Sequence, residues 1–183
     1  MPRIPLIIKH EDMPAERQHF YDRIVLNRGR VAGPFQVLLN SPDVAVRVAN
    51  VGASLLYDSV LAPAVKTLTW LIAAREYDCD YEWATCVPHA QKAGVQDALI
   101  NAIWDRKPLV GLTAEQELLV DFCHQLLRGN HHVSEPSYRA AVEHFGVAAT
   151  VQVAATIGYF VMLAFLLNAF EVDPQPGESE LPL

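Results

Sequence analysis

Hydrophobic positions along most of the chain recur three or four residues apart, the spacing that places them on one face of an α-helix. No segment alternates apolar and polar residues as a β-strand with one buried face would. Gly, Pro and capping residues separate the helical segments. The pattern predicts an all-α domain of about nine helices. The expected helices span residues 15–27, 35–39, 42–56, 64–76, 79–93, 96–104, 113–128, 134–144 and 147–170.

Side chains at two helix starts carry capping signals. Thr113 and Gln116 have the spacing of a capping box, in which each side chain bonds to the other residue's backbone N–H. Asp78 or Asp80 is expected to cap the helix over residues 79–93, because a carboxylate satisfies the free N–H groups of a first turn.

Residues 147–170 form the longest apolar run and are long enough to span a bilayer. Thr150, Gln152, Thr156 and Asn168 interrupt the run, and no other segment is comparably apolar. We therefore interpret it as a buried helix and expect no membrane span. A helix that is apolar on all sides must be covered on all sides, so we expect it at the centre of the fold or at a subunit interface.

Composition places the chain among compact globular proteins. It has 183 residues, of which 51% are hydrophobic and 19% charged. The net charge of −7, without a basic stripe, argues against nucleic-acid binding. Three Cys without a disulfide spacing, and an N-terminal apolar run too short for a signal peptide, favour the cytoplasm. We expect an N-terminal arm and first helix over residues 1–34 and a disordered acidic tail over residues 173–183.

Residues 75–94 contain the densest group of reactive side chains. As a helix, this stretch places Cys79, Glu82, Cys86 and His89 on one side, within an arc of about 80°. An acid, two thiols and an imidazole can each transfer a proton or attack an electrophile.

The same stretch resembles a known family. Tyr81-Glu82-Trp83, followed by Ala90 and Gly94-Val95, is similar to the signature of carboxymuconolactone decarboxylase-like proteins of the AhpD-like superfamily. The resemblance covers residues 35–172. It implies an AhpD-like helical bundle, a small-molecule substrate, no cofactor and a homo-oligomer, either a trimer or a hexamer.

Two positions depart from the family pattern. Cys86 stands where the family commonly has a His, and no Glu occurs near Thr67, where the family commonly has one. The peroxidase branch carries Cys-x-x-Cys-x-x-x-His, whereas the frame here reads Cys79-x-x-Glu82-x-x-x-Cys86. Two turns of helix separate the thiols by about 10 Å, which is beyond disulfide reach.

Glu82 is the first candidate for a catalytic residue. Tyr81 and Trp83 on either side would remove water from its carboxylate and raise the pKa, as a general acid or base requires; the alternative is a solvated Glu in a first helical turn. Cys86 is a candidate nucleophile if a cationic His89 lowers its pKa, and otherwise a small buried residue.

The remaining candidates have weaker signals. His89 is a candidate proton carrier or a surface histidine. Tyr81, Trp83 and Cys79 are candidate binding residues. Cys79, Cys86 and His89 do not have a recognised metal-ligand spacing, so we expect no metal.

Three functions remain open, in this order. The first is a cofactor-free enzyme that transfers a proton or decarboxylates a small organic acid or lactone, with Glu82 moving the proton and Cys86 or His89 assisting. The second is an alkylhydroperoxidase-like thiol peroxidase, which the missing Cys-x-x-Cys disfavours. The third is a non-catalytic oligomeric binding protein.

Overall fold

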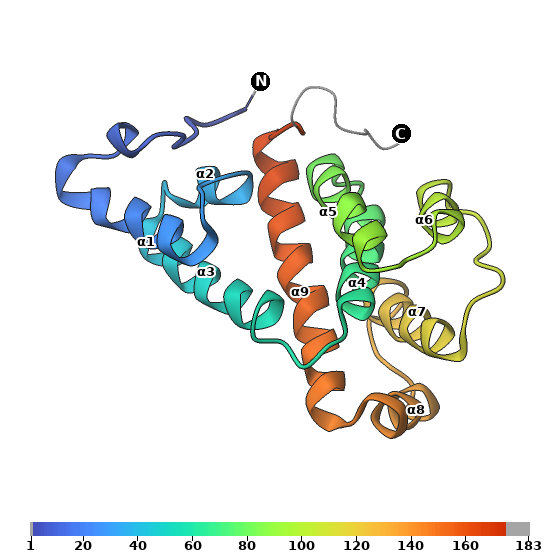
Figure 1. Cartoon of the computed structure of the whole chain (residues 1–183). Coiled ribbons are helices and arrows are strands. Elements are labelled where there is room, and N and C mark those ends of the chain that lie inside the picture. Colours follow the sequence, from blue (N-terminus) through green and yellow to red (C-terminus); the bar gives the residue numbers. More distant parts are fainter. Residues whose placement is uncertain (1, 175–183) are drawn as a thin grey trace.

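The computed structural model describes residues 2–174, and within them every regular element is helical (Figure 1). Two short 3-10 turns, His10–Asp12 and Ala15–Arg17, precede the first α-helix. The α-helices are α1 (Gln18–Arg28), α2 (Pro34–Leu38), α3 (Pro42–Leu56), α4 (Pro63–Glu76), α5 (Asp80–Lys92), α6 (Asp97–Trp104), α7 (Ala114–Leu127), α8 (Glu135–Phe145) and α9 (Val147–Phe170).

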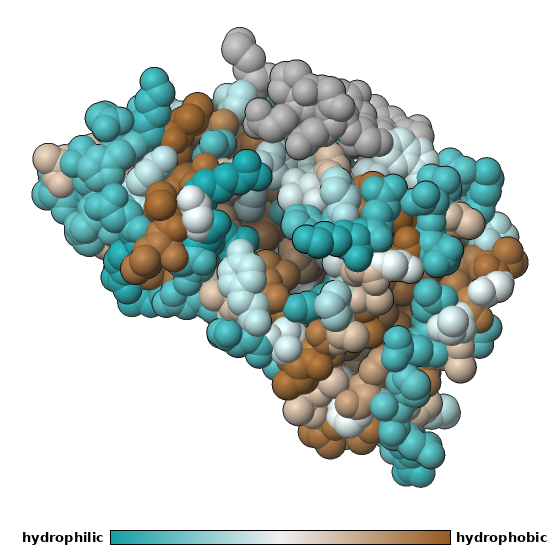
Figure 2. All heavy atoms as spheres, viewed as in Figure 1, coloured by the Kyte–Doolittle hydropathy of each residue, from teal (hydrophilic) through white to brown (hydrophobic). Residues whose placement is uncertain are grey.

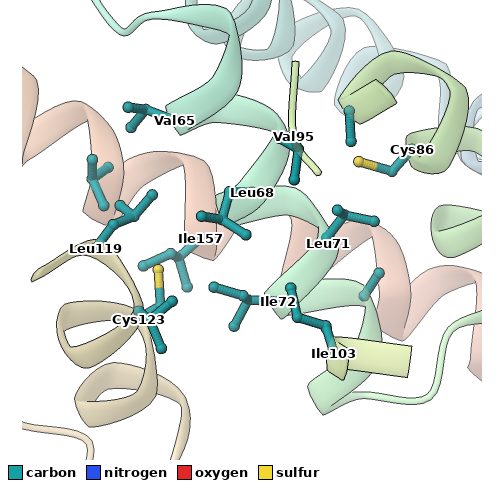
Figure 3. Close-up of a cluster of buried hydrophobic side chains, with 14 of the residues drawn as sticks. Val65, Leu68, Leu71, Ile72, Cys86, Val95, Ile103, Leu119, Cys123 and Ile157 are labelled. Atoms are coloured by element: carbon teal, nitrogen blue, oxygen red, sulfur yellow. The ribbon is translucent and has the colours of Figure 1, made fainter. Parts of the chain in front are cut away.

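Helix α9 runs through the middle of the bundle, with α1–α3 on one side and α4–α7 on the other (Figure 1). Two hydrophobic clusters share it. One is built on α4–α7 and includes Leu71 and Ile157 (Figure 3). The other is built on α1–α3 and includes Ile24 and Phe160. Because both clusters bury side chains of α9, burial between two groups of helices explains most of its long apolar run.

One strip of α9 stays uncovered. By length and composition α9 could cross a membrane, yet 44% of its most apolar window is buried inside the bundle. Val151 and Phe165 are 62% and 53% exposed, and Gly158 is exposed between them. We call Val151, Ala155, Gly158, Met162 and Phe165 the α9 strip. No charged residue lies on α9, so this strip is an apolar surface.

Local signals predicted some helix starts correctly. The backbone N–H of Gln116 donates to Thr113 Oγ1 over 3.2 Å, and the backbone N–H of Thr113 donates to Gln116 Oε1 over 3.0 Å. The expected capping box is therefore confirmed. The expected aspartate cap of α5 was wrong: Cys79 is the N-cap residue and no side chain caps it. Asp78 accepts bonds from Arg75 and Arg106 instead.

The N-terminal arm is tied to the bundle. The Arg3 backbone N–H donates to Phe170 O over 2.9 Å, and the Ile7 N–H donates to Gln36 O over 3.0 Å. The backbone of Gly33 (φ +52°) lies so close to Tyr81 that an added Cβ would be 2.5 Å from the ring. Gly33 thus lies directly against α5. The predicted tail lies outside the described residues, apart from Asp173 and Pro174.

Candidate functional site

A cavity of about 510 Å³ opens between α1–α2 and the helices α4, α5 and α9. In Figure 2 the surface is hollowed between the two groups of helices, with hydrophobic residues inside and hydrophilic residues around them. Its volume is in the range that holds a small organic ligand. Chain segments far apart in sequence build its walls, which include Phe35, Trp70 and Phe160.

Glu82 lies on the wall of this cavity and is 3% exposed. The Trp70 indole N–H donates to Glu82 Oε2 over 2.6 Å. Burial raises the pKa of Glu82 to about 7, against smaller lowering effects of the Trp70 hydrogen bond and the positive charge of Arg28. At neutral pH the carboxyl group can therefore both give and take a proton.

An aromatic stack supports the carboxyl group. The Trp70 ring lies against Phe160, with centroids 4.4 Å apart and planes 9° apart. The stack continues from Trp70 to His89, and the centroids of these two rings are 5.9 Å apart. His89 and Tyr81 also line the cavity, His89 exposed and Tyr81 buried. Since Trp70 is stacked with two other rings and bonds to Glu82, it holds the carboxyl group in a defined position.

Four basic side chains line the same cavity: Arg28, Arg30, Lys66 and Lys92. We call them the cavity cations. Glu82 is the only carboxylate among the described residues that line it. Arg28 lies over the Phe35 ring, 4.4 Å from its centroid, and Lys66 Nζ donates to Leu56 O over 2.7 Å.

The two candidate thiols lie outside the cavity. Cys86 is fully buried in the α4–α7 cluster (Figure 3), where its thiol donates to Thr67 O over 3.4 Å. Burial first, and then the charge of Glu82, raise the pKa of Cys86 well above its ordinary value. Cys79 lies in a separate buried cluster with Leu167, and burial raises its pKa to about 12. Neither thiol forms a reactive thiolate readily.

The structure thus brings together half of the residues singled out from the sequence. Glu82, His89 and Tyr81 line the cavity. Trp83 does not: it is fully buried and packs edge-on against Trp104, 5.4 Å between centroids. The aromatic side chain that bonds to the Glu82 carboxyl group is Trp70 of α4 and not Trp83.

Sequence reasoning missed Trp70, Arg28 and Phe35. Lys66 and Trp70 lie one turn apart on α4, which indicates a shared side of a helix but no chemistry. Nothing in the local sequence around Arg28 marks it as a cavity residue. Within residues 2–174, no three His, Cys, Asp or Glu side chains gather as metal ligands would.

Comparisons with known proteins show the fold. No family model matches the chain, and no curated protein does. The debrominase Bmp8 in its apo form is 13% identical, with a TM-score of 0.73 over 95% of this chain and 93% of that one. A cysteine-to-alanine variant of Bmp8 in complex with 2,3,4-tribromopyrrole is 13% identical, with a TM-score of 0.74 over 96% of this chain and 94% of that one. The predicted all-α bundle is confirmed, and the chain shares its fold with Bmp8.

Proposed function

We propose that the protein is a cofactor-free enzyme that transfers a proton to or from carbon of a small organic substrate, with Glu82 as the acid or base. The observation that carries the proposal is the position of Glu82. It is a buried carboxyl group on a cavity wall, with a pKa of about 7 and one oxygen held by Trp70. A carboxyl group kept at this pKa by burial is suited to general acid–base catalysis at neutral pH.

The specific reaction that we propose is decarboxylation of a small organic acid or lactone, in line with the resemblance of Tyr81-Glu82-Trp83 to the carboxymuconolactone decarboxylase-like signature. The bond between the carboxylate and its neighbouring carbon breaks, and carbon dioxide leaves. The electron pair stays on that carbon, and protonated Glu82 donates its proton there. Glu82 is then protonated again from solvent.

Apolar walls assist such a reaction. A carboxylate placed against Trp70 and Phe160 loses hydration, and the leaving carbon dioxide is neutral, so an apolar environment favours its departure. His89 and Tyr81 complete the wall on α5. We assign them to substrate contact.

A thiol peroxidase is the alternative enzyme, and the position of the thiols disfavours it. Neither Cys79 nor Cys86 lines the cavity, and burial raises both pKa values. A non-catalytic binding protein remains the third candidate, because such a cavity can also hold a ligand that does not react.

The test is a screen of small lactones, β-keto acids and unsaturated dicarboxylic acids for carbon dioxide release. Glu82→Gln should abolish release, while Glu143→Gln, on an exposed residue of α8, should leave it unchanged. Cys86→Ser should also remain active. Full activity of Glu82→Gln would overturn the proposal, and ligands that raise the melting temperature without turnover would favour the binding protein.

A further inference from the structure

We infer that the cavity cations form a binding site for an acid group, so that the ligand is an organic anion whose acid group is held apart from the atom that reacts at Glu82. The assignment of the reacting atom rests on the proposed function. The acid-binding site itself rests on the charges and contacts of Arg28, Arg30, Lys66 and Lys92.

Charge is distributed unevenly over the protein. The chain carries 21 acidic and 14 basic residues, a net charge of −7. In the cavity the balance is reversed, since four basic side chains face one carboxyl group. Like charges gathered in a partly enclosed space repel one another, and a bound anion relieves that repulsion. The local excess of positive charge is therefore a feature of the cavity and not of the whole surface.

None of the cavity cations forms an ion pair within residues 2–174. Basic residues elsewhere do: Arg75 and Arg106 pair with Asp78, Arg128 with Glu76 and Arg139 with Glu135. A carboxylate supplied by a ligand would form ion pairs with the cavity cations, as the protein's own carboxylates do with the other basic residues.

Two of the four side chains are already held in place. Arg28 is half-buried, with its guanidinium over the Phe35 ring and within 3.5 Å of the Tyr159 hydroxyl oxygen. Lys66 is half-buried and its ammonium group donates to the Leu56 carbonyl. Ordering these long side chains before binding reduces the entropy lost when an anion binds.

The shape of the cavity adds a second requirement. The rings of Phe35, Trp70 and Phe160 line the same cavity as the cations and Glu82. A planar ring or conjugated chain stacks on such surfaces, whereas a flexible saturated chain does not. The ligand class is therefore a single-ring or conjugated acid, with one acid group toward the cations and its apolar body against the aromatic rings; in the proposed decarboxylation the carboxylate that leaves is a second one.

Binding of such an acid should also change the protonation of Glu82. The positive charge of Arg28 lowers the pKa of Glu82 in the free protein. An anion beside Arg28 cancels part of that charge, so Glu82 should take up a proton as the ligand binds. The bound complex would then carry the protonated acid that the proposed reaction needs.

Calorimetry with benzoate, cinnamate and salicylate, each paired with its neutral amide, tests the inference. At least one carboxylate should bind about tenfold or more tightly than its amide, since a hydrogen bond to a charged group is lost in the amide. The affinity should fall with salt. Lys66→Gln and Arg28→Gln should each weaken carboxylate binding about tenfold and leave amide binding unchanged.

Arg30→Gln and Lys92→Gln each remove an exposed cation of the cavity. They provide the same test of carboxylate binding where Arg28→Gln or Lys66→Gln fails to fold. Arg47→Gln, on an exposed residue of α3 outside the cavity, is the matched control and should change nothing. Equal binding of carboxylate and amide, absence of binding by every carboxylate, or full affinity in all four variants would overturn the inference. Anion binding without turnover would refute the proposed reaction alone, and turnover that needs Glu82 but none of the cations would refute the acid-binding site alone.

Discussion

The indole N–H of Trp70 and Oε2 of Glu82 are joined by a 2.6 Å hydrogen bond across the α4–α5 contact. The structure records no hydrogen bond to Oε1 from residues 2–174, so Oε1 is the oxygen available to a ligand. Because Trp70 is stacked on Phe160, the orientation of the carboxyl group follows from the packing of three helices. This arrangement leads to the first of five predictions.

Trp70→Phe should raise the pKa of Glu82, because it removes a hydrogen bond that favours the charged form. If Glu82 donates the proton, kcat/KM falls above its pKa of about 7. The variant should move that fall to higher pH. A pH profile of kcat/KM checks this, with Trp104→Phe as a control outside the cavity. An unchanged pH profile in Trp70→Phe would show that Trp70 neither positions Glu82 nor sets its pKa.

Glu82→Gln should lower turnover by about 10²–10⁴-fold, because glutamine keeps the shape and accepts the Trp70 hydrogen bond but transfers no proton. The fold should be retained, since no ion pair is broken. Steady-state rates and circular dichroism check the two parts of the prediction. A folded variant with full activity, or one that loses several degrees of melting temperature, would mark Glu82 as a structural residue.

The contribution of Glu82 to stability should fall as the pH rises from about 4.5 to 7. The folded state holds the Glu82 proton to about pH 7, whereas the unfolded state loses it near 4.5, so the stabilisation is complete below 4.5 and is lost as the pH passes 7. The shift corresponds to about 3 kcal/mol. Denaturant unfolding at several pH values should show Glu82→Gln equal to wild type near pH 4.5 and more stable at pH 8. Parallel curves for the two proteins would contradict the raised pKa.

Thiol chemistry should be weak in the folded protein. Cys79, Cys86 and Cys123 are all buried, and burial raises each pKa. The folded protein is treated with a stoichiometric organic hydroperoxide and its thiols are then titrated in denaturant. All three thiols should still be present. Rapid loss of two thiols, restored by dithiothreitol, would instead establish the peroxidase reading.

A homo-oligomer with the α9 strip in its interface remains our expectation. The residues of the strip follow one another at intervals of four and three, the spacing of a helix–helix seam. Gly158 lies at its centre, where an added Cβ would meet no atom of the same chain, so the fold of one protomer does not require a glycine there. Light scattering should give a multiple of the protomer mass.

Phe165→Glu should reduce that mass, because it places a charge in an apolar interface. Val110→Glu changes a side chain that is 84% exposed and lies outside the strip, so it should have no effect. A wild-type protein of protomer mass at micromolar concentration would refute the expectation.

Helices could be predicted from the sequence because their signals are local. The capping box of Thr113 and Gln116 and the apolar run over residues 147–170 depend on neighbours within a few turns. The buried face of α3 depends instead on distant contacts. Val44 is 47% exposed, whereas Val46 and Ala49 are buried, because α3 packs against α1, α2 and α9 together.

The site depended on contacts that no local pattern encodes. A helical projection placed Cys86 on the side of Glu82, but it could not show that α4 covers the thiol. It marked Trp83 as the neighbour of Glu82, while the side chain that reaches Glu82 is Trp70, on another helix. Arg28 enters the cavity only because the N-terminal helices fold back onto α9.

The division of the cavity wall has an evolutionary consequence. Trp70 and Glu82, which carry the proposed chemistry, lie on α4 and α5 respectively. Arg28, Arg30 and Phe35 lie on a short stretch, from the end of α1 to the start of α2, that lines the same cavity. Substitutions at Arg30 and Phe35 can therefore alter which molecules are accepted while Glu82 and Trp70 stay in place. A library confined to that stretch, screened against acids, amides and halogenated rings, would measure how readily this bundle acquires a new substrate.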